Sequence, residues 1–371
     1  MALRRAYVIG SGPNGLTAAI TLAQAGLQVT VLEAQPTIGG GARSAGLTLP
    51  GFIHDTCSAV HPMAVSSPVF ASFPLSQFGL EWIETPVEVA HPLDDGTCVQ
   101  VHRSVAQTAS QLGPDETAYR RLMEPLAGRW HELATEVLAP LRFPAHPFLM
   151  ARFGWRAPWA ATTAARFSFK TEAARAAFAG MAAHSIVPLE YPGSAAFGWI
   201  LALSAHGAGW PIARGGSQSL TDALARYLES LGGRITVSSE VRSLDDFEPG
   251  CVILCDITPK QLLTIGGARL PAGYRRRLES YRYGPGVFKI DWALNGPIPW
   301  RAAGCGRSAT VHIGGSLEEI AASERAPEKG QIPEKPSFCW RSPAFSTLRG
   351  RPSGNTPAGL IVTCPMDRKP I

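Results

Sequence analysis

The chain has 371 residues, 45% hydrophobic and 17% charged, and a formal net charge of +5. This length is sufficient for two domains, and the scattered arginines form no basic run, which argues against nucleic-acid binding. No segment reaches the roughly 18 uninterrupted apolar residues of a membrane span. The seven cysteines include no CxxC pair, which argues against a zinc ribbon or a redox-active dithiol and predicts free thiols in a reducing compartment.

The N-terminal segment predicts a strand, a glycine turn, a helix and a second strand that ends in an acid. Residues 6–10 (AYVIG) are typical of a buried parallel strand. Residues 13–26 predict a helix of about three turns, and residues 27–34 (LQVTVLEA) predict the next strand. Because this pattern begins at once, a cleavable leader would consume a fold element, and we expect a cytoplasmic protein.

The turn after the first strand has the spacing GxGxxG, in the strand–helix context that dinucleotide binding requires. Gly10 allows the tight turn, Gly12 lets the backbone approach a pyrophosphate, and Gly15 permits close packing of helix on strand. The N–H groups around Asn14 and Gly15 would face the phosphates. Glu33 would accept hydrogen bonds from ribose hydroxyls and repel a 2′-phosphate. The alternatives are a tight turn without a ligand and, for Glu33, a solvated strand end.

A second glycine cluster, Gly39 to Gly41, follows the acidic residue, and Arg43 comes directly after it. A second glycine loop beside the first suits a longer, two-ended dinucleotide, with the arginine close to phosphate or flavin. This element favours FAD over NAD as the cofactor.

Residues 71–210 lack the strand–helix alternation. Residues 115–141 have apolar positions at helical spacing, with Asp115 as the expected cap of the first turn. Residues 143–167 mix aromatic residues with arginines. Two interpretations stay open: a lid or membrane-facing surface through which an apolar substrate enters, or helices packed over a substrate cavity with solvated arginines.

The nucleotide-binding pattern returns at residues 210–244, where a glycine pair and an amphipathic helix precede a strand expected at 234–241. Residues 250–263 predict a buried strand and a helix, with Cys251 and Cys255 as small core residues. Residues 286–294 (GVFKIDWAL) predict a strand of a second sheet. Lys289 and Asp291 share one face of it, and we expect that face to be exposed, with a position facing the substrate cavity as the alternative.

No acid–base or metal-binding signature stands out. The nine histidines have no spacing such as HExxH, no serine lies in GxSxG, and we predict no metal. His54, Asp55 and His61 follow the second glycine loop and are catalytic candidates, with hydrogen bonding to buried backbone as the alternative. A flavin itself carries the redox chemistry, so the missing signature does not count against catalysis.

Residues 10–27, 39–62, 210–225 and 281–300 together resemble bacterial phytoene-dehydrogenase-like oxidoreductases. These are relatives of the pyridine nucleotide-disulfide oxidoreductase domain-containing protein 2 family, in the amine oxidase and phytoene desaturase superfamily. The resemblance runs from residue 4 to about 336. It implies an α/β fold: a Rossmann-like FAD-binding domain (GR2-type) with an inserted α+β substrate domain.

The resemblance implies a division of residues 1–336 into four parts, followed by a tail at 337–371. The FAD-binding domain comprises residues 1–70 and 211–268, and the substrate domain comprises a mostly helical part, 71–210, and strands in 269–336. Gly41 occupies the place of the family's usual arginine, and Arg43 follows two residues later. Val241 corresponds to the backbone beside the adenine. The expected cofactor-binding residues are Gly10, Ser11, Gly12, Asn14, Gly15, Glu33, Ala34, Gly40, Gly41, Arg43 and Val241.

Residues 337–371 change character, with five prolines, five basic residues and one acid. Only GLIVTC has a strand-like pattern, and nothing supplies the segment that closes over the flavin in the family, so we expect a disordered, aberrant tail. Suitable codons read in another frame can encode a family-like continuation. The chain therefore resembles a C-terminally truncated or frameshifted member, with a divergent tail as the alternative.

The leading hypothesis is an FAD-dependent oxidoreductase that oxidises or isomerises an apolar, isoprenoid-like or lipid-like substrate by hydride transfer to the flavin. Its expected partners are that small substrate and, peripherally, a membrane. The first alternative is a catalytically incomplete fragment or a non-enzymatic binding or regulatory protein on the same fold. An NAD-linked dehydrogenase ranks third, because the second glycine loop is superfluous for it.

Overall fold

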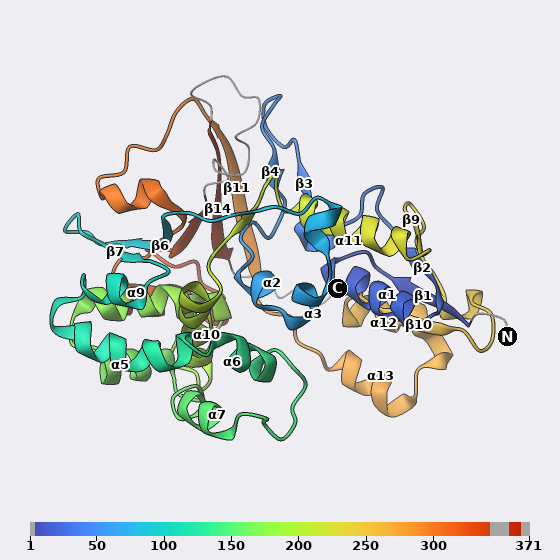
Figure 1. The fold of residues 1–371 in the computed structure, drawn as a ribbon, viewed down its shortest axis with the longest axis horizontal. Coiled ribbons are helices and arrows are strands. Elements are labelled where there is room, and N and C mark those ends of the chain that lie inside the picture. The colour runs from blue at the N-terminus through green and yellow to red at the C-terminus, as the bar shows by residue number, and fades with distance from the viewer. Residues whose placement is uncertain (1–3, 342–355, 365–371) are drawn as a thin grey trace.

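A four-stranded parallel sheet occupies one end of the computed structural model, which describes residues 4–341 and 356–364 (Figure 1). Its strand order is β10-β1-β2-β9. Helices α1 (Pro13–Gln24) and α11 (Gln218–Ser230) pack against each other beside this sheet. The buried core beneath them is aliphatic and includes Val8, Leu16, Ile20, Val31 and Leu224. The strands are β1 (Arg5–Ile9), β2 (Gln28–Leu32), β9 (Arg234–Thr236) and β10 (Val252–Cys255).

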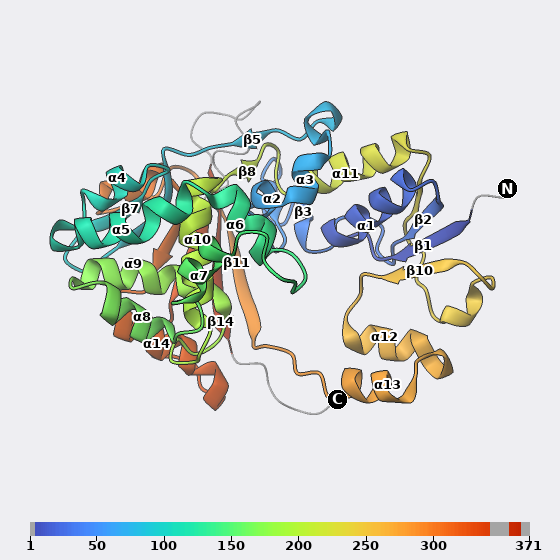
Figure 2. The ribbon, with the colours of Figure 1, turned by 60° about the horizontal axis from the view of Figure 1, so that its bottom comes forward.

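This sheet is assembled from two distant parts of the sequence. The first 32 residues supply β1 and β2, and the outer strands β9 and β10 arrive about 200 residues later. Helices α12 (Pro259–Gly266) and α13 (Ala272–Glu279) follow β10 and pack on each other (Figure 2). The predicted α/β fold with a Rossmann-like nucleotide-binding domain is confirmed.

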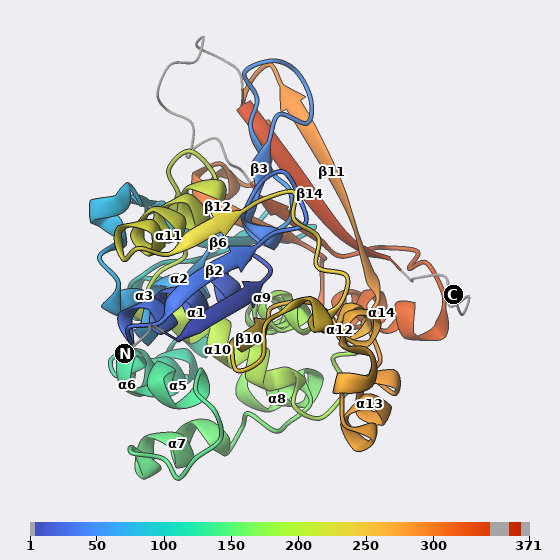
Figure 3. The same cartoon turned by 90° about the vertical axis from the view of Figure 1, so that its right-hand side faces the viewer.

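A second, six-stranded sheet has the order β11-β14-β13-β12-β6-β7 and lies beside the helical part. Strands β11 and β14 are long and antiparallel, and they run side by side along one edge (Figure 3). Because β6 and β7 come from residues 71–210, the two predicted parts of the substrate domain share one sheet. The strands are β6 (Val87–Pro92), β7 (Cys98–Val101), β11 (Gly286–Leu294), β12 (Ser308–Ile313), β13 (Phe338–Arg341) and β14 (Thr356–Cys364).

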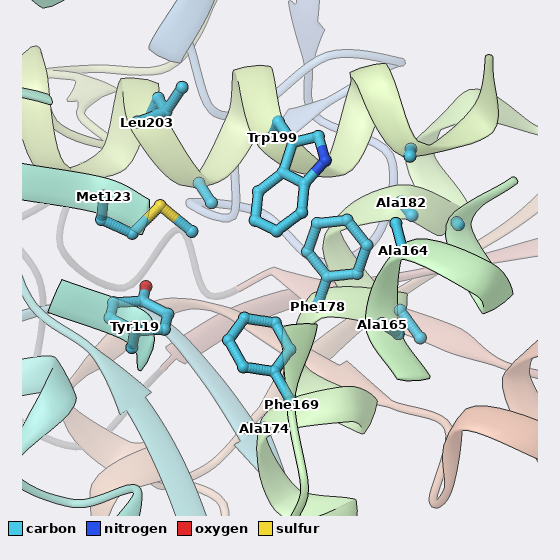
Figure 4. Close-up of a cluster of buried hydrophobic side chains, with 14 of the residues drawn as sticks. Tyr119, Met123, Ala164, Ala165, Phe169, Ala174, Phe178, Ala182, Trp199 and Leu203 are labelled. Carbon is cyan, nitrogen blue, oxygen red and sulfur yellow. The ribbon is translucent and has the colours of Figure 1, made fainter. Parts of the chain in front are cut away.

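Helix α10 (Ser194–Gly207) is apolar on several faces and is the centre of the helical layer. It contacts α9, α8, α6, α5 and α2. Figure 4 shows the aromatic rings that fill the space beside it, where the Phe178 and Trp199 ring centroids are 4.2 Å apart. The other helices of this half are α4 (Val105–Ala109), α5 (Glu116–Ala127), α6 (Trp130–Val137), α7 (Pro147–Gly154), α8 (Ala161–Ser168), α9 (Glu172–Ala182) and α14 (Leu317–Arg325).

Short elements join the half that contains the four-stranded sheet to the half that contains the six-stranded sheet and the helical layer. Two small antiparallel ladders connect segments that lie between them, β3 with β4 and β5 with β8. These elements are β3 (Ser44–Ala45), β4 (His54–Asp55), α2 (Pro62–Ser66), α3 (Pro68–Ser72), β5 (Trp82–Ile83) and β8 (Ile212–Ala213). Within the described residues, no helix combines the length and the apolarity that crossing a bilayer requires.

Two expectations about single residues are wrong. Asp115 precedes α5 but makes no capping hydrogen bond to it. Its buried carboxylate instead accepts the N–H groups of Lys170 and Thr171, both at 2.7 Å, and so fixes the start of α9. Cys251 and Cys255 are half-exposed rather than buried, because β10 is the outermost strand of its sheet.

The expected strand at 234–241 is shorter than predicted, since β9 ends at Thr236. Ser238 has a φ of +50°, which turns the chain away from the strand direction. The N–H groups of Ser238 and Ser239 then bond to the carbonyl groups of Gln35 and Glu33, at 2.9 and 2.8 Å.

The expectation of a disordered tail is wrong for two of its segments. Phe338–Arg341 and Thr356–Cys364 are strands of the six-stranded sheet, and β14 pairs with β11 along nine residues. The apolar, β-branched run GLIVTC explains the second strand. Residues 342–355 and 365–371 of the predicted tail lie outside the described residues.

The sheet also brings together two cysteines that no local motif connects. The sulfur atoms of Cys98 in β7 and Cys305 are 3.8 Å apart. The hydrogen bond between them lowers the pKa of the Cys98 thiol. The missing CxxC motif therefore does not exclude a dithiol pair formed by tertiary contact.

Replacing Asp115 tests its part in holding the helical layer. We expect Asp115→Ala to lower the free energy of unfolding by about 3 kcal/mol, because two backbone N–H groups lose a buried acceptor. The measurement is equilibrium urea unfolding. Asp95→Ala is the matched control: Asp95 accepts the Thr97 N–H and hydroxyl groups at 2.8 and 2.6 Å, but it is exposed. Equal losses in the two variants would contradict the assignment.

Candidate functional site

The first glycine turn lies between β1 and α1. Gly10 has a φ of +103° and donates its N–H to the Leu32 carbonyl at 2.9 Å. A Cβ atom on Gly10 would lie 2.4 Å from the Asp256 carbonyl oxygen, and one on Gly15 would lie 2.3 Å from the Gly10 carbonyl oxygen. The fold itself therefore requires glycine at these two positions.

Gly12 is different, because its φ of −63° suits any residue. The nearest atom to a Cβ there is a side-chain oxygen of Asp256, at 3.1 Å. Packing alone therefore does not demand a glycine at Gly12. A bare backbone at the start of α1 is what close approach by a phosphate requires.

Glu33 is buried at the end of β2 and is held by three donors. One carboxylate oxygen accepts the Ser11 N–H at 3.0 Å and the Ser11 hydroxyl at 2.5 Å, and the other accepts the Gln35 N–H at 2.9 Å. Burial opposes ionisation, but these hydrogen bonds outweigh it and hold the pKa of Glu33 below its ordinary value. Glu33 is therefore a fixed negative charge at neutral pH rather than a solvated strand end.

The second glycine loop lies against the first. A Cβ on Gly40 would be 3.0 Å from the Gly12 Cα, and the Gly39 N–H bonds to the Ser11 carbonyl at 3.1 Å. Gly40–Ala42 form a short 3-10 helix, and the half-buried Arg43 closes it by donating to the Gly40 carbonyl at 2.9 Å. The structure thus brings the two predicted loops into contact, and these loops together with Glu33 form the candidate nucleotide crevice.

The remaining predicted residues lie around this crevice. Asn14 is exposed in the first turn of α1, Ala34 is exposed between Glu33 and Gln35, and Gly41 is exposed beside Cys57. Val241 is half-buried and lies just after Ser238 and Ser239, which bond to the segment that carries Glu33. Their roles in binding stay predictions.

Asp256 belongs to the same site and was missed from the sequence. Its carboxylate accepts the Gly15 N–H at 2.7 Å, at the positive end of α1. It directly follows β10, which is parallel to β1 and adjacent to it. An acidic residue immediately after a strand that neighbours the glycine turn is the signal that could have found it.

Two of the three catalytic candidates, Asp55 and His61, lie near the start of α11. Asp55 accepts the Ser217 N–H at 2.7 Å and the Ser44 hydroxyl at 2.6 Å, and burial raises its pKa against these bonds. His61 Nε2 lies 2.8 Å from the Ser217 hydroxyl. These contacts tie the segment after the second glycine loop to α11, and a catalytic role for Asp55 or His61 stays a prediction.

His54 faces the other sheet. Its Nε2 lies 2.7 Å from the Thr48 hydroxyl, and its Nδ1 lies 3.4 Å from a carboxylate oxygen of Asp291, which pairs with Lys289. The prediction that Lys289 and Asp291 share a face is confirmed. The expected exposure is wrong, because only 17% and 16% of their side chains are accessible. The buried His54 of β4 lies against Asp291 on this face.

A cavity of about 280 Å³ begins next to the second glycine loop. Its wall includes Cys57 and Ser58, from the segment after β4 that lies against this loop, and Val287, His312 and Cys339 from the six-stranded sheet. His184, His312 and Cys339 are also the one group among the described residues whose ligand atoms converge closely enough to hold a metal ion.

A larger cavity, of about 600 Å³, opens in the helical layer. Apolar residues such as Met123, Trp199 and Leu203, seen together in Figure 4, line its inner part. Arg121, Arg152 and Arg156 line its mouth. Burial and the two neighbouring guanidinium groups lower the pKa of Arg156, so this mouth is strongly electropositive.

Comparison with known proteins supports the nucleotide-binding half. The family model of NAD(P)-binding Rossmann-like domains matches residues 8–73, which contain both glycine loops and Glu33. A search of curated proteins finds no match.

Solved structures share the fold of almost the whole chain at low sequence identity. An oxidoreductase from Methanosarcina mazei has a TM-score of 0.65 at 16% identity, with 97% of this chain and 79% of that chain covered. Putrescine oxidase bound to putrescine has a TM-score of 0.57 at 16% identity, with coverage of 98% and 76%. RAB GDI from Plasmodium falciparum has a TM-score of 0.51 at 13% identity, with coverage of 98% and 83%.

Glu33 should make the stability of the chain depend on pH. Because its folded-state pKa lies below its ordinary value of 4.5, its stabilisation is present above that value and is lost as the pH falls through the folded-state pKa. We expect Glu33→Gln to lower the free energy of unfolding by about 1–2 kcal/mol at pH 7, and by less at pH 3. Urea unfolding at the two pH values tests this, with exposed Glu229→Gln as the control. A loss that is the same at both pH values would contradict it.

Proposed function

We propose that this chain is an FAD-dependent oxidoreductase of the phytoene-dehydrogenase-like type. The observation that carries the proposal is the contact between two glycine loops beside an ionised Glu33. A single glycine turn with an acidic residue serves any dinucleotide, whereas the second loop extends the crevice toward the cavity at the six-stranded sheet. A crevice extended in this way suits a long dinucleotide cofactor that carries its reactive ring at the end opposite the adenosine.

Different residues of the chain would bind different parts of the cofactor. The backbone at Gly12 and the start of α1 would hold the diphosphate, Glu33 the adenosine ribose, and Gly40 with Arg43 the part nearer the ring. When bound, FAD supplies the acceptor for a hydride taken from a substrate carbon. The cavity wall, with apolar Val287, Ile313 and Ile320, favours an apolar substrate.

Purification gives the first test. The full chain should carry, or be reconstituted with, a flavin whose visible absorption is bleached by dithionite. A second candidate is a non-enzymatic binding protein on the same fold, favoured by the structural likeness to RAB GDI. A colourless protein that cannot be reconstituted with FAD would support this candidate and contradict the oxidoreductase.

Two glycine variants separate cofactor binding from folding. We expect Gly12→Val to weaken FAD binding by about 100-fold while lowering the melting temperature of the cofactor-free chain much less than Gly15→Ala does. The protein atom nearest to a Cβ on Gly12 is a side-chain oxygen of Asp256, at 3.1 Å, which can shift slightly. Gly15→Ala should lower both the affinity for FAD and the melting temperature of the cofactor-free chain, since its Cβ would lie 2.3 Å from a carbonyl oxygen. Gly273→Ala, on α13 with open space around it, is the control. Unchanged FAD affinity in Gly12→Val would contradict the proposed cradle.

We also propose a peripheral membrane contact by a cytoplasmic protein, through the segment that joins α6 to α7. Leu141, Phe143 and Phe148 in this region are 106%, 87% and 89% exposed. Arg142 lies between the first two, and the arginines at the mouth of the larger cavity are nearby on α5 and α7. Exposed aromatic residues beside a group of arginines suit an anionic bilayer surface.

Vesicle co-sedimentation tests the membrane contact. The double variant Phe143→Ser, Phe148→Ser should bind phosphatidylglycerol vesicles at least about 10-fold more weakly, because two aromatic side chains no longer enter the bilayer. The control exchanges two apolar residues elsewhere, Leu49→Ser and Ile332→Ser, which are 60% and 78% exposed. Equal binding by the two double variants, or none by the unaltered chain, would overturn the contact.

A further inference from the structure

Three potential metal ligands converge from three distant parts of the chain. His312 in β12 and Cys339 in β13 are directly opposite each other in an antiparallel ladder, which places their side chains close together where both lie on one face. His184 comes from the 3-10 helix Ala183–Ser185 that follows α9. Its Nε2 atom lies 2.9 Å from the Nε2 atom of His312.

The spacing of these atoms is near that of an occupied site. The two imidazole nitrogens and the Cys339 sulfur all lie within 4.8 Å of one another. Zn–N and Zn–S bonds of about 2.1 and 2.3 Å in a tetrahedron put ligand atoms about 3.3–3.7 Å apart. To close the cluster around an ion, the two Nε2 atoms would separate by about 0.5 Å and the sulfur would approach by up to about 1 Å. Both movements are within the reach of side-chain rotation.

The neighbours of His312 hold its imidazole ring with the Nε2 atom directed toward His184. Gly180 of α9 packs against its other edge, where an added Cβ would lie only 2.8 Å from His312 Nδ1 and 3.0 Å from His91 Nδ1. The Nε2 edge therefore points toward His184. His91 is buried behind this pair and bonds through Nε2 to the Gly315 carbonyl at 3.0 Å, so its ring is fixed as well.

The cluster also has an approach for an ion and room for a fourth ligand. His184, His312 and Cys339 all line the cavity of about 280 Å³. Three protein ligands with an open fourth position is the arrangement of zinc sites that bind water or another exchangeable ligand. Two imidazoles and a thiolate form a borderline-soft donor set that suits Zn²⁺ rather than Mg²⁺ or Ca²⁺.

We propose that His184, His312 and Cys339 bind a divalent transition-metal ion, Zn²⁺ by donor chemistry, with its fourth position open to the cavity. The ion replaces the proton shared between the two Nε2 atoms and takes the deprotonated thiol as its third ligand. The site shares the cavity that the proposed function assigns to the substrate, but none of its three ligands belongs to the glycine loops. Metal binding can therefore be tested in the absence of a flavin.

Cobalt titration of the chelator-treated full chain tests the site directly. One Co²⁺ per chain should produce visible ligand-field bands and a thiolate-to-cobalt charge-transfer band in the near ultraviolet. One equivalent of Zn²⁺ should remove both by displacement. The absence of the charge-transfer band, or binding without saturation, would overturn the proposal.

Variants then identify the ligands. Cys339→Ser should abolish the charge-transfer band and weaken Co²⁺ binding at least about 10-fold. Cys57→Ser, which removes another thiol of the same cavity wall, should leave the band intact. Retention of the band in Cys339→Ser, or its loss in Cys57→Ser, would contradict the assignment.

A second variant protects the test from a folding failure. His184→Gln replaces a half-buried residue at the cavity wall and should weaken Co²⁺ binding at least about 10-fold, with the melting temperature of the metal-free chain unchanged. Zn²⁺ should raise the melting temperature of the unaltered chain and of Cys57→Ser but not of His184→Gln. A rise of equal size in all three would place the ion elsewhere.

Discussion

The hydrogen bonds of Ser11 hold the nucleotide crevice together. Its N–H and hydroxyl groups both donate to Glu33, and its carbonyl accepts the N–H of Gly39. Ser11 is fully buried, so a larger side chain would separate the elements that it joins. One small residue thereby connects the turn after β1, the acidic end of β2 and the second glycine loop. The contact between the two loops depends on this connection.

The crevice combines two carboxylates with different functions. Glu33 is satisfied by donors of its own chain and keeps its charge in place. Asp256 instead accepts the Gly15 N–H at the start of α1, where the helix dipole would also attract a phosphate. A diphosphate at this helix end must therefore displace or approach an existing negative charge. Such a site favours ligands that are anchored at the sugar as well as at the phosphates, because the sugar contact offsets that repulsion.

Much of this crevice could be predicted from the sequence, because its signals are local. Gly10, Gly12, Gly15 and Glu33 lie within one strand–helix–strand unit, and the spacing of the unit determines where they meet. Gly40 and Arg43 follow in the next turn of chain. Their proximity to Gly12 required only that the second loop fold back over the first.

The features that could not be predicted from the sequence all depend on contacts between distant segments. Asp115 lies at the start of one helix but binds the N-terminus of another, 55 residues later. Asp256 reaches the first glycine turn only because β10 pairs with β1. Sequence spacing could not reveal the cluster of His184, His312 and Cys339 either, since a strand register aligns two of its members. In the last two cases the pairing of strands decides where the side chain acts.

The short strand β4 shows how the two halves of the molecule are joined. Successive residues of a strand point to opposite faces, and here the two faces belong to different halves. Asp55 bonds to the start of α11 in the nucleotide-binding half, whereas His54 approaches Asp291 in the six-stranded sheet. The segment that follows, Thr56 to Ser58, bonds back to Arg43 and Gly41 and also forms part of the cavity wall. The position of the second glycine loop and the wall of the cavity thus depend on the same few residues.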